Sequence, residues 1–208
     1  TKDGGLGIDA SSQVMLVNSA SGSQPQDFYL ANSKVNSQAY AYNESSTYIS
    51  TPSGDGRTAE FRNSGSTSAN WSSTVDLKPG EKYTFFYTNN SSASTYSGLM
   101  LKDDMTAPPA GKARVRFVNL VNGIASASLK IKGSTELASN TVFGSASSFT
   151  TVDPGTFTFQ TALSSNSAVS VDLPSVTLVA GKIYTIYTSG VLNGTASSAV
   201  TAHVLVNN

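Results

Sequence analysis

The sequence predicts an all-β protein built from two copies of one β-sandwich, and two observations lead to this prediction. Apolar and polar residues alternate along many short runs, which is the period-two pattern of half-buried strands. The chain also matches itself at a spacing of 101 residues. A period of that length indicates a duplicated domain, because solenoid repeats span only about 20–50 residues.

The self-match divides the chain into two copies and a linker. Residues 106–111 lie between the copies and contain Pro108 and Pro109, which stiffen the linker and cannot continue a strand ladder. We therefore expect a flexible N-terminal tether over 1–10, a first sandwich over 11–105 and a second sandwich over 112–208. The matched pairs are Val14/Val115, Val17/Val118, Asn18/Asn119, Phe28/Leu129, Leu30/Ile131, Tyr48/Phe149, Gly54/Gly155, Leu77/Leu178, Gly80/Gly181, Tyr83/Tyr184 and Thr84/Thr185.

The second copy shows the strand pattern most plainly, and no window in it carries a helical apolar stripe. Turn signals separate the alternating runs at Asp153-Pro154-Gly155, Ala180-Gly181 and Asn193-Gly194. About seven short strands per copy favour an immunoglobulin-like sandwich, although the Cys–Trp–Cys signature of antibody domains is missing. In chain order, the expected strands lie around 115–117, 129–131, 149, 157–159, 169–171 and 184–186.

Several segments of the second copy resemble the bacterial envelope repeat known as domain of unknown function 4397. These segments are 113–119, 142–144, 148–152, 154–157 and 178–185, and the first copy is similar through 17–18, 52–54 and 78–84. The second copy carries the clearer resemblance, although Asn119-Leu120-Val121-Asn122-Gly123 departs from the turn that many members have. The resemblance implies a secreted or lipid-anchored surface protein with tandem sandwiches, and it implies no catalytic residues.

Composition excludes several classes of function. Thirteen basic and thirteen acidic side chains give no net charge, so the basic excess of a nucleic-acid-binding protein is missing. The absence of Cys excludes disulfides, thiolate metal sites and cysteine nucleophiles. No apolar run is long enough to span a membrane. Ser and Thr together make up 57 of 208 residues, a composition often found in exported β proteins.

Residues that could carry chemistry are few. His203 is the only His and falls in the expected last strand, where a structural role is favoured over a catalytic one. We therefore expect no enzyme activity, no metal and no cofactor. Asp103 and Asp104 could contribute to a calcium site, but such a site needs six to eight oxygen ligands. A solvated acidic turn is the favoured interpretation of this pair.

Three aromatic residues of the first copy align with polar residues in the second. Tyr40, Trp71 and Tyr96 stand where the second copy has Thr141, Asp172 and Ser197. Exposed Tyr and Trp offer a flat apolar face with a polar tip, as a sugar or a protein partner would need. These three residues are the candidate ligand-binding site. Inward packing is the alternative, most of all for Trp71.

Charge is divided unevenly, with a net −3 on residues 1–107 and +3 on the remainder. If Val115, Phe117, Leu129 and Ile131 face the core, strand alternation directs Arg114, Arg116, Lys130 and Lys132 outward together. This basic face would suit an anionic polysaccharide, a partner protein or the acidic first domain. The alternative is a solvated face that protects a sheet edge.

These observations lead to two hypotheses about function. The first is a non-catalytic binding or adhesion module, with a polysaccharide or a surface protein as its partner and no nucleic acid. The second is a structural spacer, or a subunit of a surface complex that has no ligand of its own. In both we expect an exported protein at the outer membrane or cell surface, attached by a lipid anchor near its N-terminus.

Overall fold

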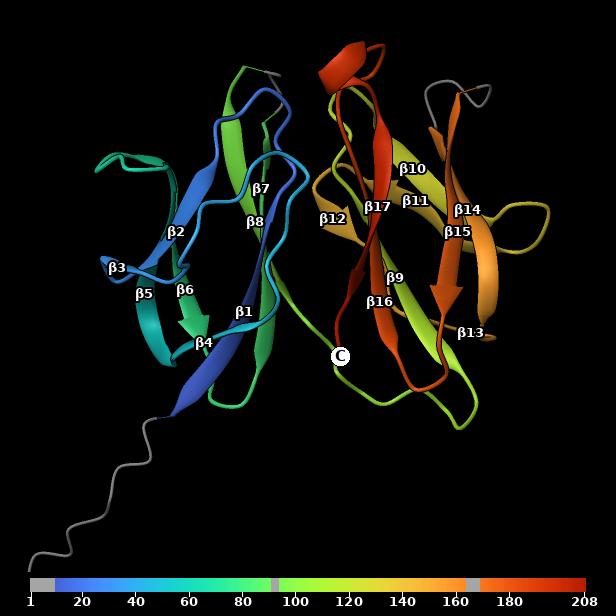
Figure 1. Ribbon diagram of the computed structural model, residues 1–208, viewed down its shortest axis with the longest axis horizontal. Coiled ribbons are helices and arrows are strands. Elements are labelled where there is room, and N and C mark those ends of the chain that lie inside the picture. Colours follow the sequence, from blue (N-terminus) through green and yellow to red (C-terminus); the bar gives the residue numbers. More distant parts are fainter. Residues whose placement is uncertain (1–9, 91–93, 164–168) are drawn as a thin grey trace, which may run out of the picture.

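The computed structural model describes residues 10–90, 94–163 and 169–208, and these form four β-sheets stacked as layers (Figure 1). The described residues contain no α-helix and one short 3-10 helix, η1 (Ala196–Ser198). The all-β prediction is therefore confirmed. The expected tether falls on residues 1–10, of which 1–9 lie outside the described part of the chain.

The first eight strands form two sheets, which we call the first half. Its outer sheet has the order β3-β2-β5-β6 and its inner sheet the order β4-β1-β7-β8. The strands are β1 (Ser11–Asn18), β2 (Gln26–Leu30), β3 (Ser33–Lys34), β4 (Ile49–Pro52), β5 (Gly54–Asn63), β6 (Ala69–Leu77), β7 (Lys82–Asn89) and β8 (Tyr96–Lys102).

The remaining strands form the second half in the same way. The outer sheet has the order β11-β10-β14-β15, and the inner sheet has the order β12-β9-β16-β17 with β13 also on β9. The strands are β9 (Ala113–Asn119), β10 (Ser126–Ile131), β11 (Glu136–Val142), β12 (Ser145–Ala146), β13 (Thr150–Val152), β14 (Gly155–Leu163), β15 (Ser170–Leu178), β16 (Ile183–Ser189) and β17 (Thr201–Val206).

Strand registers recur between the halves. Val14 of β1 pairs in parallel with Tyr83 of β7, and Val115 of β9 pairs in parallel with Tyr184 of β16. Both residues of the second pair lie 101 positions after those of the first, which is the spacing found in the sequence.

The last strand departs from this spacing. Tyr87 pairs with Gly98 in the first half, whereas Thr188, 101 positions after Tyr87, pairs with Ala202. Ala202 lies 104 positions after Gly98, because the chain between Thr188 and Ala202, which contains η1, is three residues longer than the chain between Tyr87 and Gly98. Equivalent positions in β8 and β17 are therefore 104 residues apart.

Each half has its own apolar core between its two sheets. Phe28 and Phe61 of the outer sheet meet Phe85 of the inner sheet in the first half, and all three side chains are nearly inaccessible. Phe117, Leu129 and Phe159 are among the equivalent core residues of the second half.

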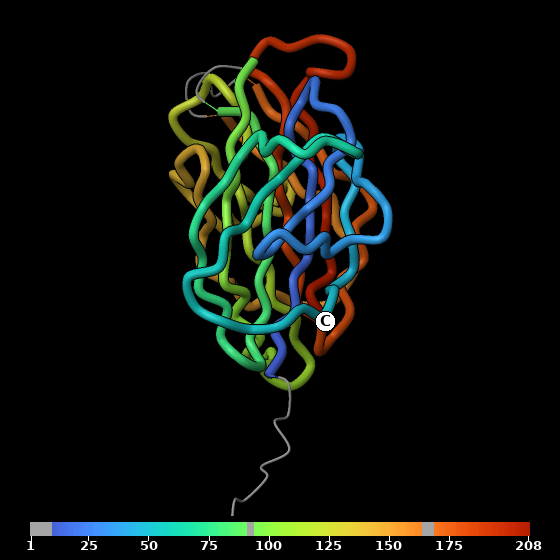
Figure 2. Tube along the Cα trace, turned by 90° about the vertical axis from the view of Figure 1, so that its left-hand side faces the viewer, coloured from blue at the N-terminus to red at the C-terminus, as the bar shows by residue number. Residues whose placement is uncertain are grey.

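A third apolar cluster joins the two inner sheets, which we call the interface core. Phe86 of β7 meets Tyr187 of β16 edge to face, with ring centroids 5.6 Å apart. The strands of the two halves run in similar directions when viewed from the side of the first half (Figure 2). The interface core consists of Met15, Val17, Phe86, Val118, Leu120, Tyr187 and Leu205.

The interface core explains why central strands are apolar on both faces. In the run Phe85-Phe86-Tyr87, the first and third side chains point into the first core and the second points at the other half. Alternation of side chains across a strand forces this division. These strands therefore depend on the neighbouring half to cover one of their faces.

Replacing Phe86 with Ala should lower the free energy of unfolding by roughly 3–5 kcal/mol, the usual cost of truncating a buried Phe. Urea unfolding followed by tryptophan fluorescence measures this change. Val142→Ala is the control, because Val142 is 55% exposed and should shift stability by no more than about 0.5 kcal/mol. Equal effects of the two substitutions would contradict the buried interface.

Candidate functional site

The most elaborate polar site lies between the two halves and centres on an ion pair. Arg116 of β9 donates from Nη2 to Oδ1 of Asp103, which follows β8, at 2.9 Å. Both side chains are almost fully buried, with 4% and 0% of their surfaces exposed. Charges removed from water this far need several hydrogen-bond partners each to offset the cost of desolvation.

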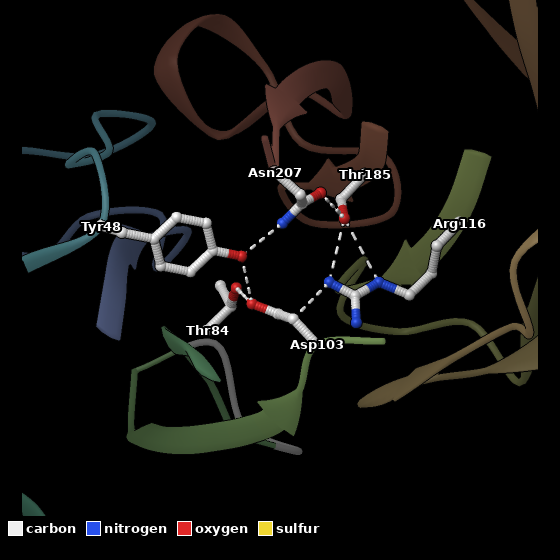
Figure 3. A network of polar contacts seen from close by, with 6 residues as sticks. All are labelled: Tyr48, Thr84, Asp103, Arg116, Thr185 and Asn207. Carbon is white, nitrogen blue, oxygen red and sulfur yellow. Dashed lines mark hydrogen bonds and ion pairs between the residues drawn. The ribbon is translucent and has the colours of Figure 1, made fainter. Parts of the chain in front are cut away.

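Those partners form a closed ring of hydrogen bonds (Figure 3). The Tyr48 hydroxyl and the Thr84 hydroxyl each donate to Asp103 Oδ2 at 2.6 Å. Arg116 also donates to Thr185 Oγ1 at 2.9 Å, from the same Nη2.

Asn207 closes the ring from the second half. Thr185 Oγ1 donates to Asn207 Oδ1 at 2.7 Å, and Asn207 Nδ2 donates to Tyr48 Oη at 2.9 Å. We call the six residues the interface network: Tyr48, Thr84, Asp103, Arg116, Thr185 and Asn207.

The network contains two equivalent halves. Thr84 and Thr185 are 101 residues apart and occupy matching places on β7 and β16. Asp103 and Asn207 each follow the last strand of their half, and their backbone N–H groups donate to Lys82 and Ile183 respectively. In each half the Thr hydroxyl therefore donates to the Asx side chain that ends the neighbouring strand.

The ionisation state of Tyr48 suits its place in the ring. Burial, followed by the charge of the adjacent Asp103, raises the pKa of Tyr48 well above its ordinary value. The hydroxyl consequently stays protonated and can donate to the carboxylate while it accepts from Asn207.

Arg114 forms a second, more exposed contact across the same interface. Its guanidinium donates to Asp104 Oδ2 at 2.9 Å and to the backbone carbonyl of Thr106. The Arg114 contact, followed by the Thr106 hydroxyl, holds the pKa of Asp104 well below its ordinary range. Phe149 lies beneath both Arg114 and Arg116, 4.7 and 4.8 Å from its ring centroid.

The predicted basic face does not form as one surface. Arg114 and Arg116 lie on β9 of the inner sheet, whereas Lys130 lies on β10 of the outer sheet. Lys132 follows β10 and pairs with Asp172. Alternation placed each side chain away from its core, but β9 and β10 belong to different sheets, so their outward faces point in opposite directions.

The acidic pair is also corrected in part. Asp104 is exposed, as the solvated turn requires, but Asp103 is only 2% exposed and is held by Arg116, Tyr48 and Thr84. The two aspartates are the acidic counterpart in the first half for Arg114 and Arg116. This was one of the three partners expected for the basic residues.

Trp71 packs against the first core rather than standing free. Its ring centroid lies 5.8 Å from that of Phe61, and the indole covers Gly98 of β8. A Cβ atom added at Gly98 would come within 2.4 Å of the indole. Trp71 thus closes the core between the β6 and β8 edges.

Tyr96 and Tyr40 are likewise half-buried against the first core. The true counterpart of Tyr96 is Val200, not Ser197, because positions in the last strand are 104 apart. Val200 packs against the second core, so this position is apolar in both halves. Tyr40 bridges to Gln26 at the start of β2. A ligand-binding role for the three aromatics stays a prediction.

His203 belongs to a smaller polar cluster at the other end of the interface. Its ring stacks on Tyr187 at 5.0 Å, and Thr201 Oγ1 lies 2.8 Å from its Nε2. Ser189 Oγ donates to Asn43 Oδ1 of the first half at 2.8 Å. Burial lowers the pKa of His203, which favours the neutral ring at neutral pH.

Sequence reasoning did not identify the interface network. One signal was present, because the runs Phe85-Phe86-Tyr87 and Ile186-Tyr187 are apolar on both faces and therefore need a cover on each. The described residues hold no group of three or more His, Asp and Glu side chains suited to a metal ion. Nor does that part of the chain contain a helix with the length and hydropathy to cross a membrane.

A double-mutant cycle should detect the buried ion pair. Arg116→Met and Asp103→Asn each install the residue found at the equivalent place in the other half, Met15 and Asn207. Arg116→Met should cost about 3–5 kcal/mol in unfolding free energy, because Asp103 stays buried without its cation. The double variant should cost at least about 1 kcal/mol less than the sum of the single variants. Strict additivity in urea unfolding would show that the two charges do not interact.

His203 should make stability depend on pH near neutrality. Its folded-state pKa lies below the unfolded value, so the unfolded chain binds more protons and stability falls as the pH drops through about 6.5. Unfolding free energies at pH 7.5, 6.5 and 5.5 measure the slope. Because the chain has one His, His203→Gln should flatten most of it, and an unchanged slope would assign the effect to other groups.

Comparison with known proteins places the chain in a family. A family model described as a domain of unknown function, DUF4397, matches residues 12–130. The matched stretch covers the whole first half and only the start of the second. It therefore does not confirm that the second copy carries the clearer resemblance.

Curated proteins and solved structures were also compared with the chain. No curated protein matches the chain. A solved structure described as a "putative cell adhesion protein" from Bacteroides uniformis is similar over 97% of this chain and 99% of that one, with 8% identity and a TM-score of 0.29. The match over 12–130 spans more than half of the 208 residues, and the chain therefore belongs to the DUF4397 family.

Proposed function

We propose that this chain is a non-catalytic structural module in which two tandem immunoglobulin-like sandwich domains are docked as one rigid body. It would serve as a spacer or as a subunit of a surface complex. The observation that carries the proposal is the interface network, whose buried ring of hydrogen bonds takes side chains from both halves. Neighbouring domains are expected to move relative to each other unless their interface is large and apolar. Here the interface core adds buried apolar side chains from both halves around the network.

The arrangement of strands supports tandem sandwich domains. In each half, two sheets enclose one core, and the first strand runs parallel to the penultimate strand. Most strands are short and antiparallel, as in immunoglobulin-like folds. A duplication of one ancestral domain accounts for the ladder pairs that recur at 101 residues.

The surroundings of the residues predicted to bind a polysaccharide favour the structural role. Tyr40, Trp71 and Tyr96 support the first core, and Arg114 and Arg116 are engaged by Asp104 and Asp103. Lys132 is paired with Asp172, and Lys130 lies on β10 of the outer sheet, away from the two arginines. The predicted residues therefore form no continuous free surface of the kind that a sugar or sulfated polymer would need.

The absence of enzyme activity is part of the proposal. His203 is half-buried, stacked on Tyr187 and favoured in its neutral form by burial. Its hydroxyl neighbour Thr201 lies on the same strand face, and no carboxylate contacts the ring among the described residues.

Location at the cell surface is the remaining part of the proposal. The Ser- and Thr-rich composition supports export, and the features by which the chain resembles its family imply a secreted or lipid-anchored protein. A lipid anchor reached through residues 1–10 stays an expectation.

Distance measurements between the outer sheets test the rigid docking. Because the chain has no Cys, Ser72→Cys on β6 and Ser170→Cys on β15 would carry the only two spin labels. Both positions are exposed and lie on opposite outer sheets. We expect one narrow distance distribution in electron–electron double resonance, and a broader one when Arg116→Met is added.

Lys130→Met is the matched control, since it removes a positive charge from β10, outside the interface. It should leave the distribution narrow. A broad distribution in the protein without Arg116→Met would show that the halves move independently, and it would overturn the rigid-body proposal.

A further inference from the structure

The outer edge of β17 has unpaired backbone groups. β17 is the last strand of its sheet and pairs only with β16. The Asn207 N–H donates to the Ile183 carbonyl at 2.8 Å. Since antiparallel pairing alternates with period two, the backbone groups of Ala202, Val204 and Val206 point away from β16. Among the described residues, these groups have no backbone partner.

The equivalent edge of the first half is protected. The positions on β8 that match Ala202, Val204 and Val206 are Gly98, Met100 and Lys102. The indole of Trp71 covers Gly98. Lys102 places a charge on the edge and pairs with Glu81 at 3.3 Å. Aromatic cover and charged side chains are common devices against unwanted strand pairing.

The β17 edge lacks these devices. Residues 199–208 contain no Asp, Glu, Lys or Arg. Across the ladder, Phe28 and Phe61 lead to Trp71, whereas the matching Leu129 and Thr161 lead to Val171. Val171 therefore occupies the place of Trp71, and its side chain is too small to cover the edge as an indole does. Val204 and Val206 are 37% and 52% exposed, which is unusual for large apolar side chains on an edge strand.

A groove runs beside this edge. It has a volume of about 500 Å³ and lies between β17 and the segment 45–48 of the first half. Met15, Tyr48 and Leu205 contribute its apolar lining, and Lys82 is its one charged residue, with Nζ 4.6 Å from the Tyr48 ring centroid. The groove exists because the two halves are docked, since its walls come from both.

A third exposed valine, Val179, lies in the connection between β15 and β16. The Val179 N–H donates to the Tyr184 hydroxyl at 2.9 Å, and Tyr184 pairs with Val206 across the ladder. Val179 is 52% exposed. Along β17, Leu205 faces the interface, and Val204 and Val206 lie on the opposite face of the strand. A strand placed on this edge could therefore meet apolar side chains on both of its faces.

We propose that the β17 edge accepts one extended, uncharged strand with apolar residues at alternate positions, contributed by a partner protein. Main-chain hydrogen bonds to Ala202, Val204 and Val206 would hold it, and its alternate side chains would fill the groove. The segment 45–48 lines the groove beside the edge, and the lack of Asp, Glu, Lys and Arg over residues 199–208 fits an uncharged strand. The inference rests on the proposed function, because the groove needs docked halves, and it explains how a structural subunit would be joined to its neighbour.

Hydrogen exchange with a strand-forming peptide tests the proposal. The probe is a capped seven-residue peptide of alternating threonine and valine, added at millimolar concentration to the isotopically labelled full chain. We expect the amide protons of Ala202, Val204 and Val206 to exchange roughly tenfold more slowly when peptide is in about tenfold excess over its dissociation constant. The same peptide with alternate amides methylated should give no protection, because it cannot complete the ladder.

Substitutions on the edge test whether the peptide protects the amide protons by binding at β17. Val204→Lys and Val206→Lys should abolish the protection, because each adds a charge to the edge. Val142→Lys is the matched control, being 55% exposed on β11 of the outer sheet, and it should leave the protection unchanged. Protection that is missing in the unmodified chain, or equal in Val204→Lys and Val142→Lys, overturns the proposal.

Two further readouts separate the remaining outcomes. Sedimentation that shows a dimer, lost in Val204→Lys, would identify a second copy as the occupant and would overturn the single-strand proposal. The spin-label distances recorded on the same protein separate the two proposals. Narrow distances without peptide protection refute only the strand site, whereas broad distances show that the groove is not maintained and refute the rigid module as well.

Discussion

Asp103 is a buried carboxylate that water does not reach. Hydrogen-bond donors from both halves of the chain compensate for its lost hydration. Tyr48 and Thr84 of the first half and Arg116 of the second each donate to it. A buried ion pair of this kind often adds little net stability compared with apolar packing, but separating its members is costly. Its main effect is to fix how the halves are placed, because a shifted arrangement that kept the interface closed would bury the two charges without partners. The interface core buries apolar surface between the halves, and the interface network determines their position relative to each other.

The two halves meet through equivalent surfaces, as in a symmetric dimer fused into one chain. Phe86 contacts Tyr187, its own counterpart 101 residues later, which is expected only close to a local two-fold axis. Two pairs of matched positions nevertheless differ, and they make the interface asymmetric. Met15 in one half corresponds to Arg116 in the other, and Asn207 corresponds to Asp103, so the complete ion pair exists on one side of the axis only.

The sequence was sufficient for the all-β class, for the 101-residue spacing and for the side of each strand that faces a core. It did not show which strands belong to the same sheet. Arg116 and Lys130 have the same outward parity, yet β9 and β10 lie in different sheets, so one side chain is buried at the interface while the other lies on an outer sheet. Alternation is a local property, whereas assignment to a sheet depends on long-range pairing. The same limit made Asp103 look like part of a solvated turn, since a single chain position does not reveal that the other half of the chain covers it.

The two halves also differ at their sheet edges. In the first half, Gly98 allows the Trp71 indole to pack against β8, and any larger residue would displace it. In the second half, Ala202 and Val171 occupy these places, and the indole cover is absent. If both edges had only to remain unpaired, the same protection would be favoured on each. The valines exposed on β17 instead carry the cost of apolar surface in water, and that cost is removed when a strand covers them. The edge that lacks protection is also the one beside the groove that the docked halves create, so rigid docking and strand acceptance follow from the same interface.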